Sequence, residues 1–70
     1  MSPIFVLGEK VRLPEDVLGL GLQRGQVGKV IYVYPNRQHV ADVEFPREDG
    51  KYAIAILAKD PGLYIVDFYP

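Results

Sequence analysis

The sequence has no cysteine, no tryptophan and no threonine, and Ser2 and His39 are its only serine and its only histidine. The absence of cysteine excludes a disulfide framework, a thiolate zinc site and a thiol nucleophile. One histidine excludes any site that needs two imidazoles, and a lone serine beside Met1 nearly excludes a hydroxyl nucleophile. An enzyme needs a nucleophile, an acid–base pair or a metal. The sequence therefore predicts a non-enzymatic protein with no catalytic residue, no metal and no cofactor.

The chain also lacks a strong charge of either sign. It carries 8 lysine and arginine residues, 9 aspartate and glutamate residues, and a formal net charge of -1. Proteins that bind nucleic acid generally carry a basic surplus. Nucleic acid is therefore not the favoured partner.

Long apolar runs are missing as well. The longest, residues 52–58, is far below the roughly 20 residues that span a bilayer. The first residues have no positive segment and only a short apolar run before Gly8, unlike a signal peptide. We therefore expect a soluble, cytoplasmic protein that does not insert into a membrane.

What the chain does have is 49% hydrophobic residues, with 7 glycines and 6 prolines at intervals. A chain of 70 residues is expected to form a single domain, residues 1–70, too small to enclose a deep active site. The segments between glycines and prolines are rich in Val, Ile, Tyr and Phe and alternate with a period of two residues, which is typical of strands. The predicted strands are residues 9–13, 26–34, 39–45, 51–57 and 63–69.

The connections between these strands complete the predicted fold. Gly50 suits a left-handed turn position, and Gly28 inside a strand suggests a bulge or a tight bend. Five short strands at this spacing predict an all-β fold, a small five-stranded SH3-like barrel whose closure removes free strand edges. The predicted connections are a long irregular arm at residues 14–25, turns at 35–38 and 46–50, and one helical turn at 58–62.

The order of several short motifs points to a family. Residues 25–30 read Gly-x-Val-Gly-x-Val, which resembles the glycine-centred strand pair of KOW-type and other SH3-like barrels. Over residues 8–60 the chain resembles a family of small bacterial proteins, domain of unknown function 4926. The resemblance implies an SH3-like fold and supplies no catalytic residue. It rests on Val11-Arg12-Leu13, Leu22-Gln23-Arg24-Gly25, Val43-Glu44-Phe45 and Gly50, while Lys29, Ala53 and the end of the chain at residues 67–70 depart from the family pattern.

Carboxylates are the remaining candidates for chemistry. Asp42 and Glu44 share one face of a predicted strand, about 7 Å apart. That spacing fits acid–base work or a hard cation, and it fits a solvated strand face as well. Glu48 and Asp49 lie in a predicted loop without the further ligands that calcium needs. We interpret these carboxylates as a solvated surface.

The 5 tyrosines are more than so small a core needs. Tyr32 and Tyr34 alternate with aliphatic residues, and so does Tyr52, so both faces of these strands cannot be core at once. We predict that Tyr32, Tyr34 and Tyr52 form an exposed stripe that contacts a protein partner or a second copy, with Arg37 as a rim charge. The alternative is a second, minor core beneath residues 4–7 and the long arm.

The predicted function is a non-enzymatic protein-interaction module. Such a module is an accessory or docking subunit, an antitoxin-like or immunity-like partner, or a homo-oligomer. The alternative is a KOW-like RNA- or ribosome-binding module, in which Tyr32 and Tyr34 stack on bases. Basic residues for that role are Arg12, Arg24, Lys29, Arg37 and Lys51, and acidic residues in the same strands oppose their field.

Overall fold

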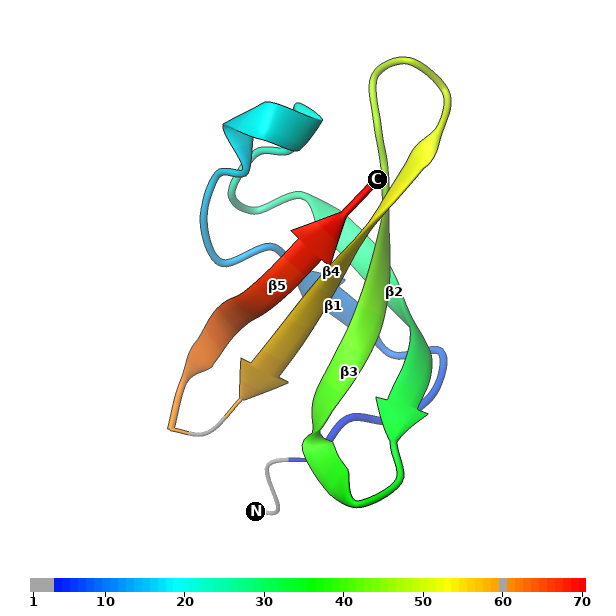
Figure 1. Cartoon of the computed structure of the whole chain (residues 1–70), viewed down its shortest axis with the longest axis vertical. Helices are drawn as coiled ribbons and strands as arrows, with labels where there is room; N and C mark the ends of the chain where they lie inside the picture. The colour runs from blue at the N-terminus through cyan, green and yellow to red at the C-terminus, as the bar shows by residue number, and fades with distance from the viewer. Residues whose placement is uncertain (1–3, 60) are drawn as a thin grey trace.

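The computed structural model describes residues 4–59 and 61–70. Five antiparallel strands form one sheet in the order β1-β2-β3-β4-β5. Figure 1 shows the sheet curled into a half-barrel, SH3-like in size, which confirms the predicted all-β class. The strands are β1 (Lys10–Arg12), β2 (Val27–Tyr34), β3 (Arg37–Pro46), β4 (Tyr52–Lys59) and β5 (Leu63–Tyr69), and a 3-10 helix, η1 (Leu18–Leu20), interrupts the β1–β2 connection.

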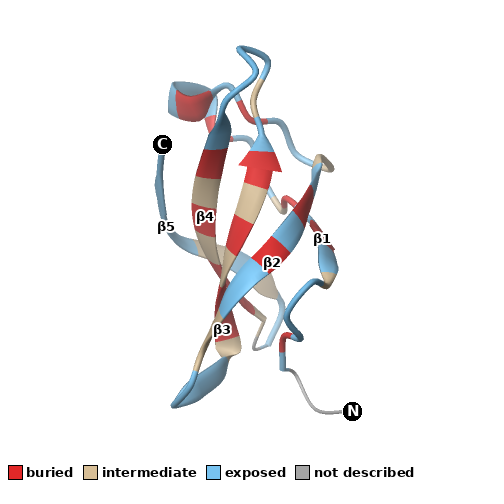
Figure 2. Cartoon of the chain, turned by 90° about the vertical axis from the view of Figure 1, so that its right-hand side faces the viewer, coloured by how far each residue is buried: buried red, intermediate tan, exposed pale blue. Residues whose placement is uncertain are grey.

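The concave side of the sheet carries the core. Buried and less buried residues alternate along β3 and β4, as the banding in Figure 2 shows. Three inward residues of β3 pair directly with three inward residues of β4, and the small alanines of β4 leave room for the Phe45 ring. The three pairs are Ala41 with Leu57, Val43 with Ala55, and Phe45 with Ala53.

The N-terminal arm and the long connection cover this core. Phe5, Leu20 and Leu22 are buried in the same cluster as the sheet residues. The Phe5 N–H donates to the Gln38 carbonyl at 2.8 Å, which anchors the arm to the start of β3. The arm and the loop therefore complete one core, and the alternative of a second, minor core is wrong. No helix in residues 4–59 or 61–70 is long and apolar enough to cross a membrane.

The barrel is open, so the predicted closure is wrong. Within the described residues β1 and β5 are the two ends of the strand order and do not pair. β1 has only three residues, because Pro14 cannot donate to a ladder. Lys59, the last residue of β4, reaches the segment before β1, since its Nζ lies 3.1 Å from Glu9 Oε2 and 4.4 Å from the centre of the Phe5 ring.

Two of the predicted connections differ from the structure. The helical turn at 58–62 is wrong for Ala58 and Lys59, which continue β4 because Val40 and Tyr64 offer Ala58 partners on both sides. Asp60, in the middle of that predicted turn, lies outside the described residues. Arg37, predicted in a turn, begins β3. The left-handed turn position of Gly50 is confirmed, with φ of 84°.

Gly28 serves a close approach rather than a bulge. It pairs regularly with Val11, and an added Cβ would lie 2.7 Å from the Glu44 carbonyl oxygen and 2.7 Å from Phe45 Cδ1. The irregularity predicted at Gly28 lies instead at Ile31, where the β2–β3 register shifts. The Phe45 ring therefore packs directly on the β2 backbone, and only glycine leaves space for it.

Candidate protein-interaction surface

The bulge at Ile31 decides which side chains of β2 point outward. Val30 pairs with the buried Val43, and after the bulge Tyr32 pairs with Asp42 on the convex face. Without the extra residue at Ile31, strict alternation would place Val30 and Tyr32 on the same face. The bulge lets β2 bury Val30 and pack the partly buried Val33 against the core while both tyrosines of the strand lie on the other face.

A second register shift does the same for β5. Asp67 pairs with Ile56 and Ile65 pairs with Leu57, so Val66 is the extra residue. Tyr69 pairs with Ile54 and Tyr64 pairs with Ala58, and directly paired residues point to the same face. Both tyrosines therefore lie on the convex face although they are five positions apart in the sequence. Strict alternation would place them on opposite faces.

All 5 tyrosines consequently share the convex face. We call this surface the tyrosine face. Four of its tyrosines are exposed and Tyr34 is half-buried. The members are Tyr32, Tyr34, Tyr52, Tyr64 and Tyr69.

The predicted residues of this face are not all neighbours. Tyr32 and Tyr34 form an edge-on pair with ring centres 5.2 Å apart. Arg37 pairs with Tyr34 in the β2–β3 hairpin, so the predicted rim charge lies beside this pair. Tyr52 lies toward the other end of the sheet, opposite Pro46 and four residues along β3 from the Asp42 that faces Tyr32. The three predicted tyrosines thus lie on one face, with Tyr34 half-buried and Tyr52 apart from the other two, and their contact with a partner stays a prediction.

Asp42 fixes the middle of the tyrosine face. Its Oδ1 accepts a hydrogen bond from the Tyr34 hydroxyl at 2.9 Å, and its Oδ2 lies 3.5 Å from the Tyr69 hydroxyl. The bond to this carboxylate, together with burial, raises the pKa of Tyr34 to about 12. Burial and the charge of Asp42 also raise the pKa of Tyr69. Both phenols therefore stay neutral and act as donors at physiological pH.

The centre of the face combines apolar area with negative charge. Ile54 and Ile56 are partly buried between the tyrosines. Glu44 pairs with Ile54, and Ile56 lies between Asp42 and Asp67 in the same cross-strand row. An arrangement of carboxylates around aliphatic and aromatic area can accept an arginine or lysine side chain from another protein.

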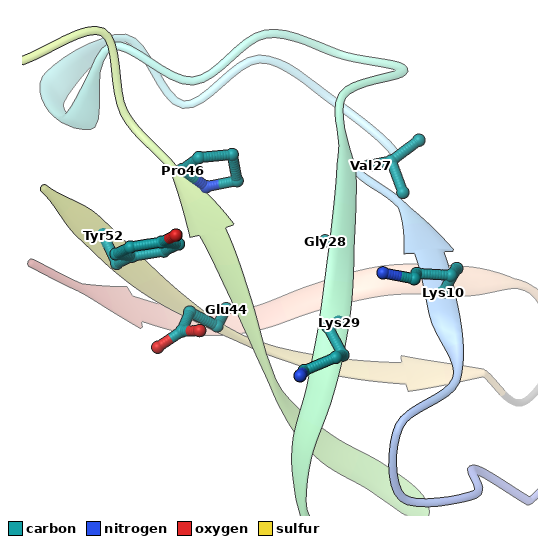
Figure 3. A pocket seen from close by; sticks show the side chains of 7 residues that line it. All are labelled: Lys10, Val27, Gly28, Lys29, Glu44, Pro46 and Tyr52. Atoms are coloured by element: carbon teal, nitrogen blue, oxygen red, sulfur yellow. The ribbon is translucent and has the colours of Figure 1, made fainter. Parts of the chain in front are cut away.

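A shallow polar pocket lies between Tyr52 and the β1–β2 edge. Its volume is about 270 Å³, and its lining includes Lys10, Lys29, Glu44 and Tyr52. Figure 3 shows Tyr52 and Glu44 on one side of this pocket and the two lysine side chains on the other. Lys10 and Lys29 pair directly across β1 and β2, and such like-charged pairs are unfavourable. The pocket extends the tyrosine face with a basic border.

The other candidates from the sequence do not come together as a reactive site. Within the part of the chain that the structure describes, no three metal-binding side chains cluster. Asp49 is committed to the β3–β4 loop, because its carboxylate lies 3.3 Å from Arg47 and accepts the Lys51 N–H at 3.0 Å. Asp42 and Glu44 lie on the convex face, but both are half-buried and Asp42 accepts the Tyr34 hydroxyl, so the interpretation of a simply solvated surface does not describe Asp42.

Comparison with family models, with curated proteins and with solved structures gives no match. The fold and the side chains of the tyrosine face are therefore the grounds for any functional assignment.

Proposed function

We propose that the protein is a cytoplasmic interaction module that docks onto another protein through the tyrosine face. The observation that carries the proposal is that all 5 tyrosines lie on one face of the sheet, those of β2 and β5 with the help of bulges and Tyr52 by regular pairing. Tyrosine is enriched at interfaces, because it offers a large contact area at low conformational cost. The main core lies on the opposite side of the sheet, and although Val40 and Ala58 are buried on the convex side, four of the five tyrosines stay exposed there.

The charge of the face defines the partner. A two-fold contact centred on Asp42, Glu44 and Asp67 would bring carboxylates of two copies together. A partner with arginine or lysine among apolar residues complements the same area. The proposal therefore commits to a different protein with such a surface, and an accessory or docking role, or one as an antitoxin-like or immunity-like partner, fits it.

RNA binding has weaker support. Lys10 and Lys29 are the basic residues at the border of the face, and Glu44 lines the same pocket. Neutralising several phosphates takes a continuous basic surface, and the carboxylates at the centre of the face oppose it. We also propose, from residue order alone, that the chain is related to domain of unknown function 4926, and the half-barrel is compatible with that relationship.

Site-specific photo-crosslinking in the native cell tests the docking proposal. A p-benzoylphenylalanine residue replaces Tyr32 in one variant, Tyr64 in a second and Leu7 in a third. Tyr32 and Tyr64 lie on the tyrosine face, whereas Leu7 is an exposed residue of the N-terminal arm. We expect one and the same protein to be crosslinked from both tyrosine positions and not from Leu7.

Three results would overturn the proposal. One is crosslinking from Leu7 as strong as from Tyr32, another is crosslinking to RNA, and the third is a crosslinked dimer of the chain itself. Tyr32 and Leu7 both lie outside the core cluster, so we expect their replacement to leave the fold intact. An unchanged thermal melting temperature in each variant checks this.

A further inference from the structure

The two free edges of the sheet are unequal. β1 is three residues long and carries Lys10 and Arg12, features that protect an edge from adding another strand. β5 is seven residues long and contains Asp67 as its one charged residue. Beyond β5 no further strand follows in the described part of the chain. Its outer edge therefore offers backbone N–H and C=O groups to a new strand, where β1 does not.

A groove with both apolar and acidic lining runs along this edge. It lies between β5 and residues 15–19, which include the start of η1, and its volume is about 370 Å³. Figure 1 shows η1 close to the C-terminal end of β5. Leu18 is 84% exposed, Val66 55% and Phe68 44%, and all three line the groove. Apolar area concentrated beside an unpaired strand edge marks a place where another chain binds.

The charge around the groove is of one sign. Its lining contains Glu15, Asp16 and Asp67, and it contains no lysine or arginine. The opposite end of the gap between β1 and β5 is occupied by the ion pair of Lys59 with Glu9. The groove thus combines exposed apolar side chains, the edge of β5 and three carboxylates.

From these features we propose that β5 receives an extended segment of another protein, in which apolar residues alternate with lysine or arginine. The new strand would hydrogen-bond to the β5 edge, place its apolar side chains on Leu18 and Phe68, and direct its cations to the carboxylates. The chain's own β1 region, from Lys10 to Leu13, shows the required alternation on the opposite edge of the sheet.

A second copy of the chain fits this edge less well than a foreign segment. The pairing of two β5 strands would bring the acidic residues of two grooves together, whereas a basic segment complements them. The occupant is therefore a short basic segment. Asp67 belongs both to this groove and to the central area of the tyrosine face, whereas Glu15 and Leu18 line the groove alone, so variants of these two residues test the groove without changing the tyrosine face.

A titration with a synthetic peptide tests this inference. The probe is a blocked peptide of seven residues, the length of β5, that alternates lysine with valine. Binding is followed by amide chemical shifts and by amide hydrogen exchange. We expect the largest shifts at residues 15–19 and 65–68 and slower exchange of β5 amides. Affinity should fall at least about tenfold when salt rises from low to near-molar concentration, because exposed charges are screened.

Matched variants and control peptides separate the parts of the proposal. Leu18→Ser and Glu15→Gln should each weaken binding about fivefold or more, by the loss of apolar contact and of charge. Leu7→Ser, Glu48→Gln and Tyr32→Ser, which lie outside the groove, should leave the affinity unchanged. A peptide N-methylated at alternate residues, and one with glutamate in place of lysine, should not bind.

Several results would overturn the inference. Equal binding of the N-methylated peptide would show adsorption by charge alone. Shifts centred on Tyr32 and Ile56 would place the peptide on the tyrosine face instead. Absence of binding by the lysine–valine peptide, or a dimer through β5 that forms without it, would equally contradict the proposal.

Discussion

The Tyr34 hydroxyl donates to Asp42 Oδ1 at 2.9 Å and joins β2 to β3 on the convex side of the sheet. Asp42 also lies opposite Tyr32, whose ring packs edge-on against Tyr34. One carboxylate therefore organises two aromatic side chains that have little contact with the core. This bond gives the tyrosine face a fixed geometry before any partner binds, and pre-organisation of this kind lowers the cost of binding.

The ionisation of Tyr34 should report this bond. The Asp42 carboxylate favours the neutral phenol and raises the pKa of Tyr34 from 10.0 to about 12. Because the folded-state pKa lies above the unfolded one, the bond contributes stability below about pH 10, and this contribution is lost as the pH rises toward about 12. Absorbance titration of tyrosinate should show a late-ionising phenol that is absent in Tyr34→Phe.

The Asp42→Asn variant tests whether the Asp42 carboxylate causes the raised pKa of Tyr34. Loss of the carboxylate charge should lower the pKa of Tyr34 toward 10.0 and also lower that of Tyr69. An unchanged titration curve in Asp42→Asn would mean that the carboxylate does not hold the phenol in solution.

Gly28→Ala should destabilise the fold by about 1–3 kcal/mol, the usual cost of overpacking a core. An added Cβ would lie 2.7 Å from a backbone oxygen of Glu44, which cannot move away as a side chain can. Urea unfolding measures the change in the free energy of unfolding. The matched control is Gly19→Ala, where no atom lies within 4 Å, and it should not destabilise the protein. An equal loss in both variants would contradict the close approach of Phe45.

Glu9→Gln should cost less than about 1 kcal/mol at pH 7, because the pair with Lys59 is partly solvated. Burial raises the pKa of Glu9, but the Val6 N–H and the Lys59 ammonium outweigh it, and the pKa lies below its usual 4.5. The folded-state pKa is depressed, so the contribution is present above about pH 4.5 and is lost as the pH falls through the folded pKa.

Thermal melts between neutral and acidic pH measure this dependence. The difference between wild type and Glu9→Gln should shrink in acid, and it should be smaller in a Lys59→Met background, where only the bond from the Val6 N–H to Glu9 remains. A difference that grows in acid would have the wrong sign for this ion pair.

The sequence predicted the fold class. Alternation puts Ala41, Val43 and Phe45 on one face of their segment, as it does Val11 and Leu13, and all five are buried. From Ala41 to Phe45 β3 pairs regularly with β4, so a period of two residues describes this stretch.

The same rule failed where the pairing shifts. The extra residues at Ile31 and Val66 reverse the alternation within β2 and β5. Whether a strand bulges depends on how its neighbours pair and pack, and one strand's own sequence does not contain that information. For this reason the sequence indicated Tyr32, Tyr34 and Tyr52 but missed the shared face of Tyr64 and Tyr69.

The sequence pattern also could not predict that the barrel stays open. Alternation at residues 9–13 is compatible with a strand that closes a barrel, whereas the ladder of β1 has only three residues. The difference lies in the loop that follows, where Val17, Leu20 and Leu22 cover the core in place of a closing strand. Long-range packing of an irregular loop has no local pattern from which it can be read.

The most direct test of the docking proposal uses the protein that photo-crosslinking identifies as the partner, purified by itself. Calorimetry then measures its affinity for wild type and for Tyr32→Ser, with Leu7→Ser as the matched control. Tyr32 is 48% exposed, so its loss should leave the fold intact. We expect Tyr32→Ser to weaken binding by about 2 kcal/mol or more, roughly 30-fold, and Leu7→Ser to have no effect. Equal affinities for wild type and Tyr32→Ser would contradict the assignment of the tyrosine face as a docking surface.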